Sequence, residues 1–359
     1  LVAIIEGLPA GLHLDVEDIN LQLQRRQMGY GRSARQRMEQ DRVHLIAGLA
    51  HGRTTGGPLA LHIENRDWAT WKEKDLPALT IPRPGHADLA GAMKYGFEDM
   101  RPVLERASAR ETAARVAVGA VARQLLQEFD IRLGSYVVEI GGVIADVPDL
   151  PYDELWARAE ASNVRCPDPA SSKAMQRRIH EARRAKDSLG GVFVVVATSV
   201  PPGLGSYVHW DRRLDARLGQ AILSIQAIKG IEIGPAFANA RRTGTQVHDQ
   251  IFMENGRLIR HTNYAGGLEG GVTNGQPLVM RAAMKPIPTT LTPLHSVDLA
   301  TGKPATTQYQ RSDICAVPAA AVVGEAMVAW VITEALLEKV GGDSLAEMKA
   351  HWEAWKHYA

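Results

Sequence analysis

Residues 106–129 read RASARETAARVAVGAVARQLLQEF, and they carry the clearest helix signal of the chain. Ser108 is followed three residues later by Glu111, the spacing of a capping box at a helix start. The apolar side chains that follow recur along one side: Ala114, Val118, Val121, Leu125 and Leu126. We therefore predict a helix that begins at Ser108 and runs to Phe129.

The sequence around this helix contains both helical and strand-like patterns. Further helices are expected at Asp18 to Arg26, Asp153 to Ala161, Ser171 to Ala185, Asp211 to Gln226, Pro318 to Val340 and Ser344 to His357. Strands are expected at Val43 to Ala47, Leu59 to Ile63, Ser135 to Ala145, Gly191 to Val200 and Gly271 to Ala282. Because the two kinds of element are mixed without a regular β-α-β alternation, an α+β fold is predicted. No low-complexity linker or fixed-period repeat divides the 359 residues, so we predict a single domain over residues 1–359.

The charges of the chain nearly cancel, with 41 Lys and Arg against 40 Asp and Glu. This balance argues against a surface built to hold nucleic acid, so an anion site has to be local. Cys166 and Cys315 lie far apart without C-x-x-C spacing, a pattern that suits a reducing compartment and supports neither disulfides nor a metal site. We predict a cytoplasmic protein without a structural metal.

The most apolar stretch, Ala316 to Leu337, is long enough to cross a bilayer. Glu325 and Glu334 fall inside it, and Pro318 lies at its start, so a buried amphipathic helix is the better interpretation. The chain does not open with a basic segment followed by an apolar run, and we predict neither a signal peptide nor membrane contact.

Arginines crowd the segment RRQMGYGRSARQR, residues 25–37. Guanidinium groups bind phosphate and carboxylate with two parallel hydrogen bonds, so the segment is a candidate site for a small, multiply charged anion. A solvated basic loop would show the same pattern. Contact with nucleic acid is a third interpretation, but Tyr30 is the only aromatic residue within the segment.

Two further segments combine backbone constraint with charge. Arg106 and Arg110 flank the predicted helix start, where free N–H groups and the helix dipole favour a phosphate or carboxylate, although simple capping would look alike. Residues 82–88 read PRPGHAD and restrict the backbone around His86, a side chain suited to proton exchange near neutral pH. A structural or surface histidine is the alternative there.

Two segments near the C-terminal end complete the candidates. The run GGLEGGVTNG (residues 266–275) and KPIPTT (residues 285–290) would let a backbone approach a flat or charged ligand closely, or would form tight turns beside a strand. Residues 311–313, RSD, place a cation beside a possible base, and a surface ion pair would look the same. General signatures such as G-x-G-x-x-G, G-x-x-x-x-G-K-[ST], H-E-x-x-H and G-x-S-x-G do not occur.

Taken together and in this order, these segments resemble the chorismate synthase family over nearly the whole chain. Further matching segments are IIEGLPAG (4–11), TTGGP (54–58), KYG (94–96) and GIEIG (230–234). RPGHAD (83–88) and RASARET (106–112), at their mutual spacing, are the most specific matches.

The resemblance implies a fold in which helices are sandwiched between antiparallel sheets, assembled as a homotetramer. It implies a lyase (EC 4.2.3.5) that catalyses the anti-1,4-elimination of phosphate from 5-enolpyruvylshikimate 3-phosphate to give chorismate, the last common step of the shikimate pathway to aromatic amino acids. It also implies reduced FMN, which lends an electron transiently without net redox change. NADPH is a possible source of reducing equivalents, and an external flavin reductase is the expected partner because no dinucleotide-binding motif is present.

The resemblance also assigns roles to single residues. His86 matches the histidine that protonates the reduced flavin, and Asp313 matches an aspartate that assists proton removal. The matching FMN positions are Arg106, Ala107, Ser108, Gln226, Ala227, Gly270, Lys285, Pro286, Ile287, Pro288, Thr289 and Arg311. Arg26 and Arg32 match positions assigned to NADP and suit the phosphate and carboxylates of the substrate equally well, while Arg83 and Arg110 are further substrate-binding candidates.

The sequence departs from the family pattern in two places. The family begins with a Gly-Glu-Ser-His-Gly segment that is absent here, and we expect a chain that truly starts at Leu1 to keep its fold but lose most turnover. Ile287 and Pro288 stand where hydroxyl side chains are commoner, so contacts there would use the backbone. The alternatives are an FMN-dependent oxidoreductase that transfers a hydride and an RNA-binding module that uses residues 25–37.

Overall fold

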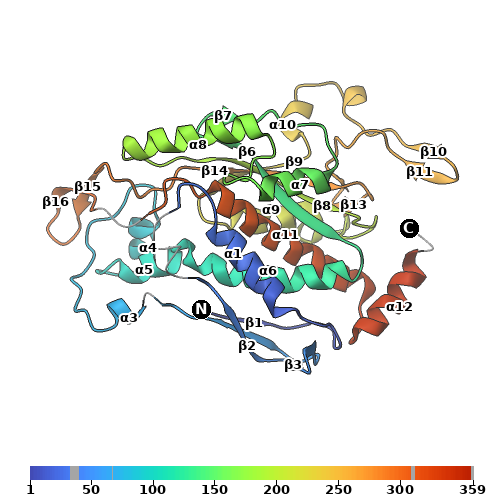
Figure 1. The fold of residues 1–359 in the computed structure, drawn as a ribbon, viewed down its shortest axis with the longest axis horizontal. Coiled ribbons are helices and arrows are strands. Elements are labelled where there is room, and N and C mark those ends of the chain that lie inside the picture. The colour runs from blue at the N-terminus through green and yellow to red at the C-terminus, as the bar shows by residue number, and fades with distance from the viewer. Residues whose placement is uncertain (33–39, 67, 309–311, 357–359) are drawn as a thin grey trace.

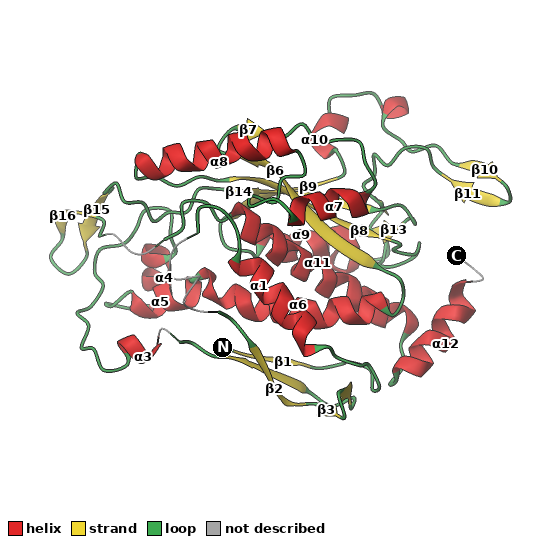
Figure 2. Ribbon diagram, viewed as in Figure 1, coloured by secondary structure: helices red, strands yellow, loops and turns green. Residues whose placement is uncertain are grey.

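The computed structural model describes residues 1–32, 40–66, 68–308 and 312–356 (Figure 1). Helices α1 (Val16–Gln27), α6 (Thr112–Gln127) and α11 (Val317–Val340) form a central layer and contact one another. This layer lies between a smaller and a larger antiparallel sheet (Figure 2). Both sheets therefore bury an apolar face against the same helices.

Helix α11 is mostly buried. It contacts α6, α1, α9 (Leu214–Leu223), α12 (Leu345–Lys356), β6 (Arg132–Ile140) and β8 (Gly191–Thr198). The helix is long and apolar enough to span a membrane, but 78% of its most apolar window is buried within the structure. A buried helix is thus confirmed. Its expected amphipathic character is wrong for residues 317–326, which are all buried, whereas Glu334 and Glu338 nearer its C-terminal end are partly exposed.

The crossing of α6 and α11 depends on a glycine. A Cβ atom built on Gly119 would lie 2.4 Å from the Cα atom of Ala326. Any larger residue would push the two helices apart. Gly119 therefore sets how closely the central layer packs.

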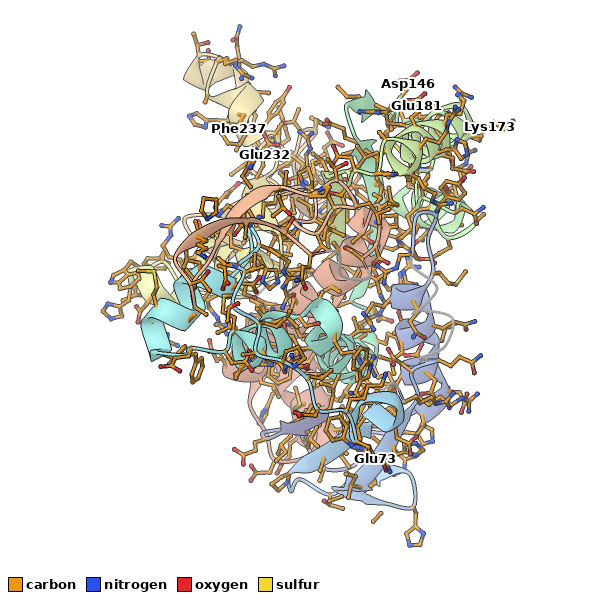
Figure 3. The ribbon with its side chains drawn as sticks, turned by 90° about the vertical axis from the view of Figure 1, so that its left-hand side faces the viewer. Glu73, Asp146, Lys173, Glu181, Glu232 and Phe237 are labelled. Atoms are coloured by element: carbon orange, nitrogen blue, oxygen red, sulfur yellow. The ribbon has the colours of Figure 1, made fainter. Side chains whose placement is uncertain are left out.

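The larger sheet has five strands in the order β7-β6-β8-β14-β9, all antiparallel. The strands not yet given are β7 (Val143–Ile144), β14 (Leu278–Met284) and β9 (Ile228–Ile233). One face of this sheet packs on α11, and α7 (Tyr152–Glu160) covers part of the other face, while α8 (Pro169–Arg184) contacts β6 and β7. Figure 3 shows Asp146, Lys173 and Glu181 gathered around α8, on the side away from the central helices.

The smaller sheet has three strands in the order β1-β5-β2, with bounds β1 (Val2–Ile5), β5 (Leu59–Ile63) and β2 (Val43–Ala47). Along β5, Leu59, Leu61 and Ile63 are buried and alternate with half-buried residues. This period of two is expected of a strand whose two faces differ in burial. The buried face contacts α6.

Short elements connect these layers. The helices are α3 (Trp68–Trp71), α4 (Asp88–Tyr95), α5 (Arg101–Ala107), α10 (Ala236–Asn239) and the 3₁₀ turns η1 (Ala109–Glu111), η2 (Trp210–Arg212) and η3 (Gly244–Gln246). The strands are β3 (Leu49–Ala50), β4 (Arg53–Thr54), β10 (Phe252–Glu254), β11 (Arg257–Ile259), β12 (Leu268–Glu269), β13 (Val272–Thr273), β15 (His295–Asp298) and β16 (Lys303–Thr306). The hairpins β10–β11 and β15–β16 project at opposite ends of the molecule (Figure 1).

The predicted α+β class is confirmed, and each predicted helix or strand overlaps an observed one. Two predicted strands are wrong in extent, since residues 135–145 and 271–282 each contain a turn between two strands. Strands β1 and β9 and helices α4 and α5 were not predicted. These four elements are short, between four and eight residues, so their periodic signal is weak.

Candidate active site

A cavity of about 490 Å³ opens where the ends of several central elements meet. Its walls come from the C-terminal end of α1, the loop before α4, the α5–η1 turn, the end of β14 and the start of α11. This volume lies within the range of small-molecule sites. The cavity is thus a place where segments far apart in the sequence can act on one ligand.

Most of the predicted site residues line this cavity. They are Arg26, Arg32, Arg83, His86, Ala107, Ser108, Arg110, Gln226, Ala227, Lys285, Ile287, Pro288, Thr289 and Asp313. Arg106, Gly270 and Pro286 do not line it. The side chain of Arg106 is 80% exposed on the last turn of α5, and Gly270 lies in the turn between β12 and β13. Arg311 lies outside the described residues.

One wall of the cavity is smooth and apolar. At the start of α11, Ala316, Ala319, Ala320 and Val323 face it, and Met284 at the end of β14 joins them. Small side chains at helical spacing leave a broad surface without polar atoms. A flat apolar ring would find van der Waals contacts on this wall.

His86 is held by a buried aspartate. The Nδ1 atom of His86 lies 2.6 Å from Oδ1 of Asp88, and Arg83 donates to Asp88 from Nε at 2.8 Å. Burial alone would raise the pKa of Asp88, but hydrogen bonds from His86 and Arg83 hold it well below its usual range. The carboxyl group is therefore ionised at neutral pH.

An ionised Asp88 fixes the tautomer of His86. A carboxylate only accepts, so Nδ1 carries a proton and donates it to Asp88. Arg83 also lies 3.0 Å from Nδ1 through Nη2, but a protonated Nδ1 has no lone pair to accept that contact. The Nε2 atom is then the one that can give or take a proton at the cavity.

The loop that carries His86 is fixed from across the fold. Gly85 has a φ of +77°, which suits the tight turn before the histidine. Lys285 donates from Nζ to the carbonyl of Gly85 at 2.5 Å, and Arg83 donates from Nη1 to Thr289 Oγ1 at 3.0 Å. The segment after β14 therefore positions the histidine loop.

The described arginine side chains of the arginine-rich segment are largely buried. The side chains of Arg25, Arg26 and Arg32 are only 12%, 5% and 9% exposed. Arg25 points to Glu160 and Glu325, whereas Arg26 and Arg32 line the cavity. The interpretation as a solvated basic loop is wrong for these three arginines, because little of their side chains reaches solvent. The same burial disfavours contact of these three arginines with a nucleic acid. Arg35 and Arg37 lie outside the described residues.

Asp313 pairs with a cavity arginine. Its Oδ2 atom lies 2.6 Å from Nη1 of Arg32, and the two side chains are 11% and 9% exposed. The residue after Asp313, Ile314, donates from its backbone N–H to the carbonyl of Gly31 at 2.9 Å, which ties the two segments together. A carboxylate held at the cavity in this way can accept a proton from a bound molecule.

The helix start at Ser108 differs from the prediction. Ser108 ends α5 and caps the 3₁₀ turn η1, and its Oγ accepts from Arg110 N at 3.3 Å. Glu111 does not complete a capping box but pairs with Arg115 at 2.9 Å and accepts from Gln226 at 2.6 Å. The N–H groups of Ser108, Arg110 and Glu111 bond within the chain, so these three groups do not bind an anion, and the side chain of Arg110 supplies positive charge here.

Two carboxylates behind the cavity were not among the predicted site residues. Asp88 belongs to the recognised PRPGHAD segment, but the pattern did not show that its carboxylate contacts both His86 and Arg83. Asp41 contacts Arg26 and Arg110 and lies beyond the arginine-rich segment. Across the described residues, no group of three or more His, Cys, Asp or Glu side chains is placed to hold a metal ion.

Comparisons with known proteins agree on one family. A family model described as chorismate synthase matches residues 1–337. The chorismate synthase of Trichlorobacter lovleyi is 56% identical over 366 residues, which cover 97% of this chain and 93% of the relative. That of Aquifex aeolicus is 50% identical over 376 residues, covering 100% and 94%. A solved crystal structure of chorismate synthase superimposes with a TM-score of 0.81 at 44% identity, covering 99% of this chain and 93% of that one.

The chain belongs to the chorismate synthase family. It is accordingly an enzyme of the lyase class, EC 4.2.3.5, that acts on a small-molecule substrate. The chorismate synthase match spans every segment that lines the cavity, from Arg26 to Val323, whereas α12 lies beyond it. The cavity is therefore the candidate active site of this family member.

Proposed function

We propose that the cavity binds reduced FMN together with 5-enolpyruvylshikimate 3-phosphate and eliminates phosphate in the anti-1,4 sense to give chorismate. The reaction involves no net redox change and is the last common step of the shikimate pathway to aromatic amino acids. One observation carries the proposal: five cations, the His86–Asp88 pair and Asp313 surround a single cavity with an apolar wall. The five cations are Arg26, Arg32, Arg83, Arg110 and Lys285.

The residues present fit a flavin mononucleotide. The α11 wall suits an apolar ring system, and the cations suit a phosphate. Within the described part of the chain, the Nε atoms of Arg26 and Arg32 are buried and have no hydrogen-bond partner. Ala227 has a φ of +65°, an unusual conformation for a residue with a side chain and one that clusters at ligand sites.

The proposed FMN contacts are those predicted positions that line the cavity: Ala107, Ser108, Gln226, Ala227, Lys285, Ile287, Pro288 and Thr289. Arg106, Gly270, Pro286 and Arg311 stay predictions that rest on the family resemblance. For Arg26 and Arg32 we favour the substrate over NADP, together with Arg83 and Arg110. The substrate carries a phosphate and two carboxylates, and buried guanidinium groups bind such anions more strongly than exposed ones.

The protein's part in the chemistry is placement and proton transfer. Bound reduced FMN supplies the transient electron that helps the phosphate to depart. His86, with Nδ1 committed to Asp88, exchanges a proton at Nε2. Asp313 accepts a proton on the side of the cavity near Arg32. The arginines stabilise the charge that develops on the leaving phosphate.

The proposal extends to the setting of the enzyme. We place it in the cytoplasm as a single domain that forms a homotetramer and receives reduced flavin from an external reductase that uses NADPH. The burial of α11 inside the protein and the two buried free cysteines, Cys166 and Cys315, support the cytoplasmic assignment.

An anaerobic assay tests the proposed reaction. The purified protein is mixed with pre-reduced FMN and the enolpyruvyl substrate, and chorismate, phosphate and flavin redox state are followed together. Chorismate and phosphate should appear in equal amounts over many turnovers while the flavin ends in its reduced form. Oxidation of one flavin for each product molecule would instead favour the hydride-transferring oxidoreductase. Salt-sensitive RNA binding that survives replacement of His86 and Asp313 would favour the RNA-binding module.

A further inference from the structure

A single buried carboxylate joins two of the cavity arginines. Oδ2 of Asp41 lies 2.8 Å from Nη2 of Arg26, and Oδ1 lies 2.5 Å from Nη1 of Arg110. The Asp41 side chain is 0% exposed, and Asp41 does not line the cavity that both arginines line. It therefore lies behind them, out of reach of a ligand.

The rest of this cluster fixes its members from three separate elements. Arg26 comes from the last turn of α1 and donates from Nη1 to Thr112 Oγ1 at 3.3 Å. Arg110 comes from η1 and donates from Nη2 to the carbonyl of Glu64 at 2.9 Å. Asp41 itself is anchored by its backbone N–H, which donates to Gln27 Oε1 at 3.1 Å. Each guanidinium group is thus held in a defined direction.

The charges explain why a carboxylate is needed at this point. Burial is the largest influence on the pKa of Arg26 and lowers it, and the nearby charges of Arg32 and Arg110 lower it further. The Asp41 carboxylate acts in the opposite direction and keeps Arg26 charged. Two guanidinium charges against one carboxylate leave one positive charge, and it faces the cavity because the carboxylate lies behind.

We propose that Asp41 is a positioning residue, which holds Arg26 and Arg110 in one fixed arrangement for an anionic group of the ligand. The inference rests on the proposed function, because the ligand is the phosphorylated and carboxylated substrate. Asp41 does not touch that ligand; it acts through the two arginines. A fixed pair of guanidinium groups loses little freedom on binding, so its benefit should appear in affinity for a shaped anion.

Asp41→Asn tests the inference because asparagine keeps the size of the side chain and removes its charge. Substrate binding, measured by calorimetric titration of flavin-saturated protein, should weaken at least about tenfold, the effect of losing one charged hydrogen bond. Inorganic phosphate alone should bind as before or more tightly, because the variant cavity is more positive and phosphate is compact. The substrate affinity of Asp41→Glu, which keeps the charge, should fall between those of the wild type and Asp41→Asn.

Glu325→Gln is the matched control. Glu325 is also a buried carboxylate shared by several arginines, but it does not line the cavity. It contacts neither Arg26 nor Arg110. At a temperature where circular dichroism shows both variants folded, it should leave substrate affinity unchanged. The inference is overturned if Asp41→Asn leaves substrate affinity unchanged or binds both the substrate and inorganic phosphate more tightly than the wild type. It is also overturned if Asp41→Asn and Glu325→Gln weaken substrate binding equally. A wild-type protein that neither binds the substrate nor forms chorismate would overturn the proposed function itself, and the inference with it.

Discussion

Replacing Glu325 by glutamine should destabilise the fold strongly. The Glu325 side chain is 1% exposed in the middle of α11 and accepts hydrogen bonds from three arginines and a serine. Arg25 donates from Nη1 and Nη2 at 2.8 and 2.9 Å, and Arg123 donates at 2.7 Å. Arg165 and Ser135 donate at 3.1 and 2.5 Å. A glutamine would leave three buried guanidinium groups without this countercharge and would turn an NH₂ group towards donors.

The size of the effect follows from the charges. Burial alone would raise the pKa of Glu325, but Arg25, Arg165 and Arg123 lower it from 4.5 to about 2. A depressed carboxyl pKa stabilises the fold fully above pH 4.5, and this stabilisation disappears as the pH falls towards 2. The shift corresponds to roughly 3 kcal/mol. Removing one partner of a buried ion pair costs about 3–5 kcal/mol, which agrees in size.

Urea unfolding followed by tryptophan fluorescence measures the loss of stability and its dependence on pH. At pH 7 the free energy of unfolding should be lower by about 3–5 kcal/mol in Glu325→Gln than in the wild type. The gap between the two proteins should narrow as the pH falls from 4.5 to 3, because only the wild type has a carboxyl group at position 325 that takes up a proton on unfolding. Glu181→Gln is the control: its ion pair with Arg178 is exposed, and its loss should cost less than about 1 kcal/mol. A gap that stays constant with pH would refute the assignment of this energy to the Glu325 charge.

Three substitutions probe the cavity. His86→Ala should lower turnover about 10²-fold, the effect of losing an acid–base group, while FMN affinity measured by fluorescence titration stays within about twofold; wild-type turnover would remove His86 from the reaction. Asp88→Asn should lower turnover at least about tenfold in the same assay, because an amide no longer fixes the proton on Nδ1 of His86 or holds Arg83 by charge. A variant as active as the wild type would show that the histidine needs no such partner. Lys285→Ala should raise the FMN dissociation constant about tenfold, since a cation and the anchor of the Gly85 carbonyl are lost together; an unchanged constant would place Lys285 outside the flavin site.

The sequence predicted those parts of the fold and the site that depend on neighbouring residues. The long helix after Ser108 has an apolar period of its own, although of its predicted apolar side Val121, Leu125 and Leu126 are buried while Ala114 and Val118 are half-buried. The histidine loop of residues 82–88 carries its aspartate and arginine within a few positions. Both therefore could be recognised locally. The predicted capping box does not form, because the Glu111 side chain in η1 pairs with Arg115 in α6 and accepts a hydrogen bond from Gln226 instead.

Pairings between distant segments could not be predicted. Arg25 and Glu325 are 300 positions apart, and Arg110 and Asp41 are 69 apart. Nothing in a basic segment shows which arginines turn inward, because the sequence looks the same whether their partners are water or buried carboxylates. Arg25 and Arg26 are adjacent on α1, yet one joins the buried Glu325 network and the other joins the cavity. The two arginines have different partners because different parts of the fold pack against the two sides of α1.

The same pairings explain how a basic cavity can exist before a ligand arrives. Buried guanidinium groups without countercharges would repel one another and lose their hydration, so an unpaired set would favour opening of the site. Asp41, Asp88 and Asp313 lie beside the four cavity arginines and prevent this. The arginines are therefore oriented during folding, and ligand binding does not bear that cost. Five cations against three carboxylates still leave an excess of positive charge, so the cavity can attract an anion and also hold it in one orientation.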